Sequence, residues 1–220
     1  MSSDAFVRIA IDGPSGAGKS TIARRIADIL DIDYIDTGAM YRAIALKLIK
    51  SGIDASSEPE RLAQMLDDTT VDIDRGTVLL DGEDVSAFIR NPDVTAEASR
   101  SSAISSIREK LVSLQRDMGT VKSVVMDGRD IGTNVLTGAE YKFYMTACPE
   151  ERARRRFKEL IDAGSDSSYE DVLTAILKRD YDDSHRALNP LKKAEDAILI
   201  DTDDLDIDEV TDLILTYIKE

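Results

Sequence analysis

Residues 13–20 have the types and spacing of a loop that binds phosphate groups; they read Gly-Pro-Ser-Gly-Ala-Gly-Lys-Ser. The glycines allow successive backbone N–H groups to converge on a di- or triphosphate. The ammonium of Lys19 can reach the outer phosphates, and the hydroxyl of Ser20 can bind Mg2+. We therefore expect a nucleotide-phosphate site formed by Gly13, Pro14, Ser15, Gly16, Ala17, Gly18, Lys19, Ser20 and Thr21.

The segments on either side of this loop support that interpretation. Before it, residues 6–12 form a β-branched apolar run that predicts a strand. After it, Ile22, Ile26 and Ile29 recur at helical spacing. A helix that begins at the loop would add the partial positive charge of its N-terminus. The alternative is a glycine-rich turn that matches by chance, and the order of strand, loop and helix argues against it.

Arginines in other segments could bind a second phosphorylated ligand. Arg42 ends the segment Asp-Thr-Gly-Ala-Met-Tyr-Arg, Arg129 lies in Asp-Gly-Arg-Asp, and Arg179 and Arg186 flank Asp183. Guanidinium groups suit this role because their planar fork matches phosphate oxygens. For Arg129 the alternative is a purely structural ion pair with a neighbouring aspartate.

A denser group of cations follows in one predicted helix, and it comprises Arg152, Arg154, Arg155, Arg156 and Lys158. Phosphoryl transfer spreads negative charge over the phosphate oxygens, so cations and Mg2+ supply most of the stabilisation. A cationic helix that closes over the phosphates would also expel water. The alternative is a solvated surface, with Glu150, Glu151 and Glu159 as ion-pair partners.

Asp127 follows the apolar run Val-Val-Met and occupies the position of a Walker-B-like carboxylate. We expect it to orient Mg2+ through bound water or to hold an arginine; the alternative is a strand-end cap. The groups expected to carry a phosphoryl transfer are Lys19, Asp127, Arg129, Arg155 and Arg186. No general base is required when the acceptor is itself an anionic phosphate oxygen.

Short apolar runs alternate with helical patterns along most of the chain. The predicted strands are residues 7–12, 33–36, 123–127, 141–147 and 197–201, and the clearest helices begin at Lys19 or span 40–50 and 207–218. This alternation predicts an α/β fold with a parallel five-stranded sheet covered by helices on both faces. Ligands of such sheets bind at the carboxyl ends of the strands, where Asp12, Asp36 and Asp127 fall.

One stretch interrupts the alternation. Residues 70–81 alternate at period two around Arg75 and Gly76, which predicts a β-hairpin, and residues 82–90 could add a third strand. We place a small β-rich insertion at 62–92, within a core made of 1–61 and 93–220. Residues 92–118 have a helical pattern that fits one helix or two.

The composition restricts the partners. A formal net charge of −15 argues against broad contact with nucleic acid. No apolar run reaches 18 residues, and residues 1–6 lack the basic and apolar regions of a secretory signal, so we expect no membrane association. The single cysteine, Cys148, fits a reducing cytoplasm, and we interpret it as a small core residue at a strand end. With no apolar stripe left over, we expect a monomer.

Five motifs together give the chain a family resemblance. They are residues 11–20, 36–42, 127–132 (Asp-Gly-Arg-Asp-Ile-Gly), 151–156 (Glu-Arg-Ala-Arg-Arg-Arg) and 179–186. With them the chain resembles the bacterial-type cytidylate kinases, in the nucleoside monophosphate kinase group of P-loop proteins, over nearly all of its 220 residues. The resemblance implies a P-loop NTPase fold, in which the β-rich insertion is a monophosphate-binding subdomain and residues 150–168 form a helical lid.

The resemblance also implies an activity and a set of binding residues. The reaction would be transfer of the γ-phosphoryl group of ATP to CMP or dCMP, with Mg2+. The acceptor phosphate would be held by Thr37, Tyr41, Arg42, Arg129 and Arg186. Cytosine would be read by Ser99, Arg108 and Asp130, and the pentose would contact Arg179 and Asp183. Thr37 stands where the family usually has serine, a change that keeps the hydroxyl.

Two other functions stay open. The first is a kinase for another small acceptor, such as a different nucleoside monophosphate or shikimate. The second is a nucleotide-binding regulator that hydrolyses ATP slowly and transfers nothing. The arginines in several separate segments argue against a regulator, because such a protein needs no residues that bind a second anion.

Overall fold

The computed structural model describes residues 6–74 and 76–218. Its centre is a five-stranded parallel sheet in the order β2-β6-β1-β7-β8. The strands are β1 (Arg8–Asp12), β2 (Asp33–Asp36), β6 (Val124–Gly128), β7 (Tyr141–Thr146) and β8 (Ile198–Asp201). Each strand bound lies within one residue of its expected position, so the predicted parallel sheet is confirmed.

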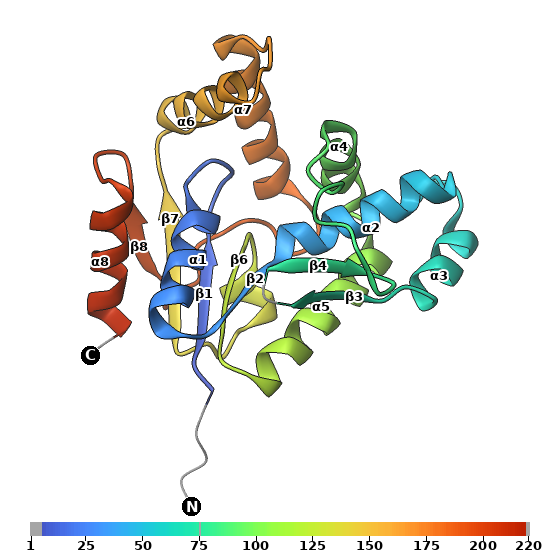
Figure 1. Ribbon diagram of the computed structural model, residues 1–220, viewed down its shortest axis with the longest axis horizontal. Coiled ribbons are helices and arrows are strands. Elements are labelled where there is room, and N and C mark those ends of the chain that lie inside the picture. Colours follow the sequence, from blue (N-terminus) through green and yellow to red (C-terminus); the bar gives the residue numbers. More distant parts are fainter. Residues whose placement is uncertain (1–5, 75, 219–220) are drawn as a thin grey trace, which may run out of the picture.

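Helices cover both faces of this sheet (Figure 1). The helix α1 (Lys19–Leu30) and the closing helix α8 (Ile207–Ile218) pack on one face, against Ile9, Ile11 and Phe143. The helices α2 (Thr37–Ser51) and α5 (Ser105–Val121) pack on the other, where Ala10 and Met126 are buried. Residues of β1 therefore alternate between two cores, as the period of a strand requires.

The insertion contains a three-stranded antiparallel sheet formed by β3 (Val71–Asp74), β4 (Thr77–Leu80) and β5 (Glu83–Asp84). Ile73 pairs with Val78 in the predicted hairpin, whose residue Arg75 lies outside the described residues. The third strand is much shorter than the expected 82–90. The helix α3 (Pro59–Asp67) crosses the expected boundary at residue 62, and the domain division stays a prediction.

The helical region after the insertion consists of two helices, α4 (Pro92–Ser101) and α5. The Asn91 side chain caps α4 by accepting a hydrogen bond from the Asp93 N–H at 2.9 Å. A short π-helical turn, η1 (Ile131–Val135), follows β6. It places backbone N–H groups next to the end of β1.

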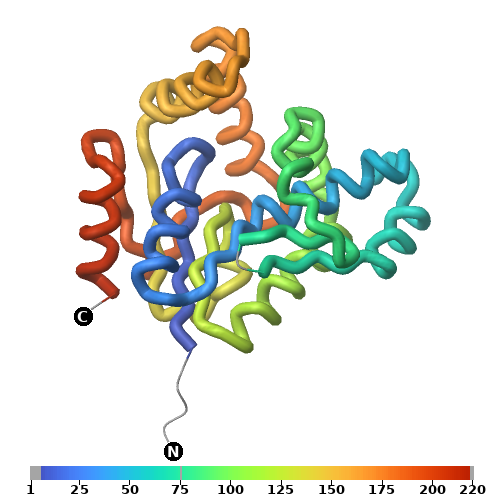
Figure 2. Tube along the Cα trace, in the orientation of Figure 1, coloured from blue at the N-terminus to red at the C-terminus, as the bar shows by residue number. Residues whose placement is uncertain are grey.

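The predicted lid segment 150–168 covers most of α6 (Pro149–Asp162) and the loop after it, and α6 forms a helical hairpin with α7 (Tyr169–His185). Figure 2 shows this hairpin, in orange, and the insertion, in teal, as separate projections from the sheet. Cys148 directly precedes α6 and is exposed, so its interpretation as a core residue was wrong. The strand ends at Thr146, and the Cys148 N–H turns outward to the Asp203 carboxylate at 2.7 Å. None of the described helices is long and apolar enough to cross a membrane.

Candidate active site

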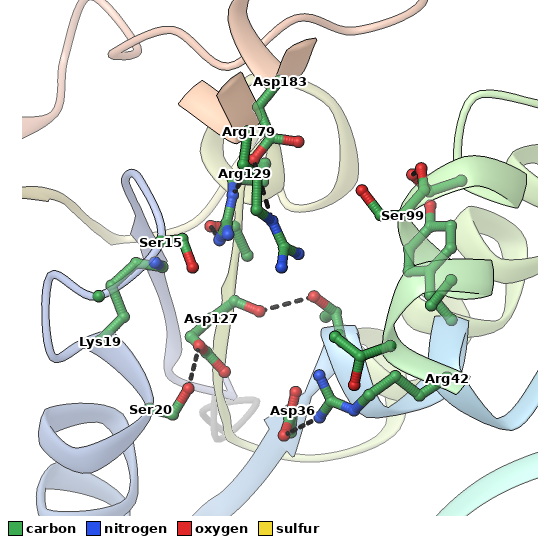
Figure 3. A pocket seen from close by; sticks show the side chains of 18 of the residues that line it. Ser15, Lys19, Ser20, Asp36, Arg42, Ser99, Asp127, Arg129, Arg179 and Asp183 are labelled. Atoms are coloured by element: carbon green, nitrogen blue, oxygen red, sulfur yellow. Dashed lines mark hydrogen bonds and ion pairs between the residues drawn. The ribbon is translucent and has the colours of Figure 1, made fainter. Parts of the chain in front are cut away.

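The carboxyl ends of β2 and β6 and the loop that follows β1 border a cavity of about 430 Å³. Strand register places Asp127 beside Ile11 and Asp36, and Asp12 beside Gly128. Figure 3 shows the cavity with the loop residues Ser15, Lys19 and Ser20 on one side and Ser99 and Arg42 on the other. The sheet edge predicted to bind ligands is therefore the edge that is hollowed.

The loop between β1 and α1 has a conformation that only glycine can adopt at its first residue. Gly13 has φ 147°, and a Cβ there would collide with the carbonyl oxygen of Met145. Gly16 and Gly18 have φ 79° and 84°, again in the left-handed region. Of the nine predicted loop residues, six line the cavity: Ser15, Gly16, Gly18, Lys19, Ser20 and Thr21.

Lys19 is buried below this loop at 5% exposure. Its ammonium donates a hydrogen bond to the Pro14 carbonyl at 2.7 Å. Burial lowers the pKa of Lys19, and the nearby charge of Arg129 lowers it further. Asp127 and Asp12 offset these effects in part, but among the described residues Lys19 forms no ion pair with a carboxylate, and a bound phosphate would supply that anion.

Asp127 binds two hydroxyl groups. Ser20 Oγ donates to one carboxylate oxygen at 2.8 Å, and Tyr34 OH donates to the other at 2.9 Å. Burial raises the pKa of Asp127, and the charge of Asp36 adds to the effect. Among the described residues it makes no ion pair with an arginine, so the suggestion that it holds one is not supported. Tyr34 was not predicted as a site residue.

The helix α2 begins at the cavity wall and presents residues of the second motif. Asp36 caps α2 through the Ala39 N–H at 2.8 Å and also accepts from Arg42 at 2.9 Å. Thr37 Oγ1 donates to the Asp127 carbonyl at 2.6 Å, which joins α2 to β6. Arg42 and Tyr41 line the cavity from this helix.

Arg129 and Arg179 lie together above the strand ends (Figure 3). Arg129 Nε donates to the Asp183 carboxylate at 2.7 Å, and Arg179 Nε lies 3.9 Å from the same oxygen. Burial raises the pKa of Asp183, but these arginines outweigh it and hold the pKa below its usual value. Desolvation, then Arg129, lowers the pKa of Arg179 to about 10, although 39% of its side chain is exposed; it stays charged at neutral pH.

Asp130 gathers three donors. Arg108 donates at 2.6 Å, Arg186 at 2.8 Å and Asn134 at 3.0 Å. Arg108 is 3% exposed, and its guanidinium lies 5.7 Å from the centre of the Tyr41 ring. This network brings together three predicted residues that are distant in the sequence, Arg108, Asp130 and Arg186, and Asn134 is a member that the sequence did not single out.

The lid arginines have different surroundings. Arg155 is not among the residues that line the cavity; it donates to the Thr202 carbonyl at 2.5 Å and pairs with Glu151 at 3.1 Å. Arg156 lines the cavity although it pairs with Glu159, and Arg154 is exposed and pairs with Glu151. The surface ion pairs considered as the alternative are thus present at each of these positions.

The cavity carries an excess of positive charge in an acidic chain. Eight cationic side chains and five carboxylates line it, whereas the whole chain has a net charge of −15. The Nε atoms of Arg42, Arg108 and Arg179 are buried without a hydrogen-bond partner in the described structure. Lining residues that the sequence did not single out are Arg90, Thr95, Ala98 and Ser102.

Comparison with known proteins decides the family. A family model described as cytidylate kinase matches residues 9–220. The chain belongs to the cytidylate kinase family. It is 50% identical to a cytidylate kinase of Caldanaerobacter subterraneus, over 97% of this chain and 95% of the relative. It is 51% identical to one of Caldicellulosiruptor saccharolyticus, over 95% and 94%. A third, from Clostridium botulinum, is 46% identical over 97% and 98%.

Solved structures agree with this family at the level of the fold. An uncharacterized protein from Eubacterium ventriosum superposes with a TM-score of 0.56 at 16% identity, over 97% of this chain and 98% of that one. A shikimate kinase from Bacteroides thetaiotaomicron superposes with a TM-score of 0.51 at 12% identity, over 97% and 99%. At such identities the likeness establishes the fold alone.

Proposed function

We propose that the protein transfers the γ-phosphoryl group of ATP to CMP or dCMP and yields ADP with CDP or dCDP. Membership of the cytidylate kinase family supports this activity. The observation that supports the mechanism is one cavity lined by a glycine loop on one side and by arginines from separate segments on the other, and both groups are suited to bind anions. Two phosphorylated ligands bound there would meet end to end.

At the first end, ATP binds the loop 13–21. Backbone N–H groups and the N-terminus of α1 face its phosphates, and Lys19 exchanges the Pro14 carbonyl for a phosphate oxygen. Ser20 Oγ and one Asp127 carboxylate oxygen lie 2.8 Å apart, so the two oxygens could act as ligands of one metal ion. This pair fits Mg2+, which is usually held by one or two carboxylates plus phosphates. When bound, Mg2+ would neutralise phosphate charge.

At the second end, the acceptor phosphate binds Thr37, Tyr41, Arg42, Arg129 and Arg186. Arg129 and Arg186 are oriented by Asp183 and Asp130, so their remaining N–H groups are fixed in direction before the ligand arrives. Such preorganised donors stabilise the charge of the transition state without reorganising. In-line positioning and charge neutralisation then carry the rate.

Ser99, Arg108 and Asp130 read the base in this proposal, and Arg179 and Asp183 contact the pentose. Cytosine offers acceptors at O2 and N3 and a donor at N4, which matches a set of one guanidinium, one carboxylate and one hydroxyl. Arg155 contributes to transfer only if it leaves Thr202 when the lid closes. The monomeric state and the location in the cytoplasm stay predictions.

The test of this function is ADP release with each acceptor in turn. With ATP and Mg2+, we expect kcat/KM for CMP or dCMP to exceed that for UMP, AMP, GMP and shikimate by about 100-fold or more, because mismatched buried polar groups are costly. Preference for another acceptor would favour the first alternative. Tight ATP binding without acceptor-dependent ADP release would favour the regulator.

Arg108→Ala should raise KM for CMP about tenfold or more and change KM for ATP little. The reason is that one good base contact is worth about 1–3 kcal/mol. The hydrogen-bond partners of Arg108 are Ser102 and Asp130, and neither belongs to the glycine loop. Steady-state kinetics at saturating co-substrate measures both constants. Arg100→Ala, which removes an exposed arginine paired with Glu97, is the matched control. Equal effects on the two KM values would remove Arg108 from the base site.

A further inference from the structure

Arg152 is the first arginine of the lid helix, and its surroundings differ from those of the other lid arginines. It is 3% exposed and is not among the residues that line the cavity. Its Nε donates to the Ala147 carbonyl at 2.9 Å, Nη1 donates to the Ser15 carbonyl at 3.1 Å, and Nη2 lies 2.6 Å from the Asp180 carboxylate. The guanidinium is therefore already engaged on all three nitrogens.

The contact with Ser15 joins the lid to the donor loop. A Cβ on Gly16 would lie 3.1 Å from the Arg152 Cβ and 3.2 Å from its carbonyl oxygen, so α6 rests directly on the loop. The Ser15 carbonyl and the Gly16 N–H belong to the same peptide group, and Gly16 lines the cavity. A phosphate that accepts from this N–H polarises the peptide and makes the carbonyl a stronger acceptor for Arg152.

The contact with Asp180 joins the same arginine to the acceptor side. Asp180 lies on α7 beside Arg179 and three residues before Asp183, which orients Arg129 at 2.7 Å. The second carboxylate oxygen of Asp180 is buried without a partner in the described structure. Arg152 is thus the charged group that holds Asp180, and one side chain connects the donor loop to the helix that carries acceptor-binding residues.

The hairpin α6–α7 can respond as a unit. Its apolar contacts, formed by Ala153, Val172 and Ile176, make a cluster separate from the two cores that flank the sheet. Polar contacts such as those of Arg152 therefore contribute strongly to how the hairpin is positioned over the cavity. A change at one of them can shift α7 without unfolding the sheet.

We infer that the Arg152–Asp180 ion pair couples the two substrate sites, so that a nucleotide on the donor loop strengthens binding of the acceptor. The inference rests on the proposed function for the identity of the two ligands. Coupling of this kind is reciprocal, so the acceptor must strengthen donor binding by the same factor. Arg152 is then a positioning residue and not a phosphate ligand.

Calorimetric titration of CMP, with and without a saturating non-hydrolysable ATP analogue and Mg2+, tests the coupling. In the wild-type protein the analogue should lower the Kd of CMP about fivefold or more, the lower end of the usual range. Asp180→Asn and Arg152→Lys should each reduce this factor to less than about twofold, while CMP alone binds with a nearly unchanged Kd. The double variant should lose no more coupling than either single variant, because the two residues act as one pair.

Two matched controls separate coupling from a general effect of substitution. Asp182→Asn removes an exposed carboxylate from α7, and Arg154→Lys alters an exposed arginine of α6. Both should keep the wild-type coupling factor. Wild-type coupling in Asp180→Asn and Arg152→Lys, or an equal loss of CMP affinity with and without the analogue, would overturn the inference.

Failure of the inference is distinguishable from failure of the proposed function. If the wild-type protein releases ADP with CMP but shows no change of CMP affinity on addition of the analogue, the function stands and the coupling is wrong. If no acceptor stimulates ADP release, the proposed function itself is wrong. Thermal unfolding of each variant identifies those whose binding changes come from lost folding.

Discussion

Replacing Lys19 with alanine should lower kcat by about 10³-fold while the protein stays folded, because it removes a positioned cation from the transferring phosphoryl group. The ammonium is buried next to the loop and bonded to a carbonyl that a phosphate oxygen can replace. In this buried environment the effective dielectric constant is lower than in water, so each interaction between charges is stronger. ADP release with CMP and ATP measures the effect.

The stability of this variant separates a catalytic role from a structural one. Folding lowers the pKa of Lys19, so a protonated Lys19 makes the folded state less stable at neutral pH. This destabilisation decreases as the pH rises toward the ordinary pKa of 10.5. Removing the lysine relieves this cost, so we expect the midpoint of thermal unfolding to stay the same or rise. Lys192→Ala, at an exposed lysine, is the control for both measurements. Near-normal turnover in Lys19→Ala would refute its role.

The sheet and the phosphate loop could be predicted from the sequence because their signals are local. Most strands of the main sheet are short, largely apolar runs with clear ends, and the glycines of residues 13–18 mark the turn before α1. The insertion was less predictable. Its third strand depends on pairing with β4 and extends only over Glu83 and Asp84, instead of the predicted 82–90.

The partners of the site residues could not be predicted, because they depend on contacts between distant segments. Tyr34 reaches Asp127 only because β2 and β6 are neighbours in register. Asn134 reaches Asp130 through the π-helical turn, which has no clear sequence signal. Packing also determines which face of the lid helix α6 is turned toward the cavity. As a result, Arg156 lines the cavity while Arg155 binds Thr202.

Arg129 was predicted from a local signal, but its orientation depends on such distant contacts. Substitution of Arg129 is therefore the sharpest test of how the acceptor phosphate is bound. The residue was identified from its place after an apolar strand, but its orientation comes from Asp183 on α7 at 2.7 Å and from the Gly128 carbonyl at 3.2 Å. Both contacts use Nε and Nη1. In the described structure Nη2 makes no hydrogen bond, so it is the nitrogen available to a phosphate oxygen.

Arg129→Lys should therefore lower kcat nearly as much as Arg129→Ala, by about 10²- to 10³-fold for each. A lysine keeps the charge but cannot bind Asp183 and a phosphate in fixed directions at once, since its ammonium is a single point on a flexible stem. KM for ATP should change little in either variant, and Arg25→Ala, an exposed arginine paired with Asp208, should behave as wild type. A wild-type kcat in Arg129→Lys would mean that the positive charge alone suffices. The fixed orientation of the Arg129 guanidinium would then have no part in the transfer.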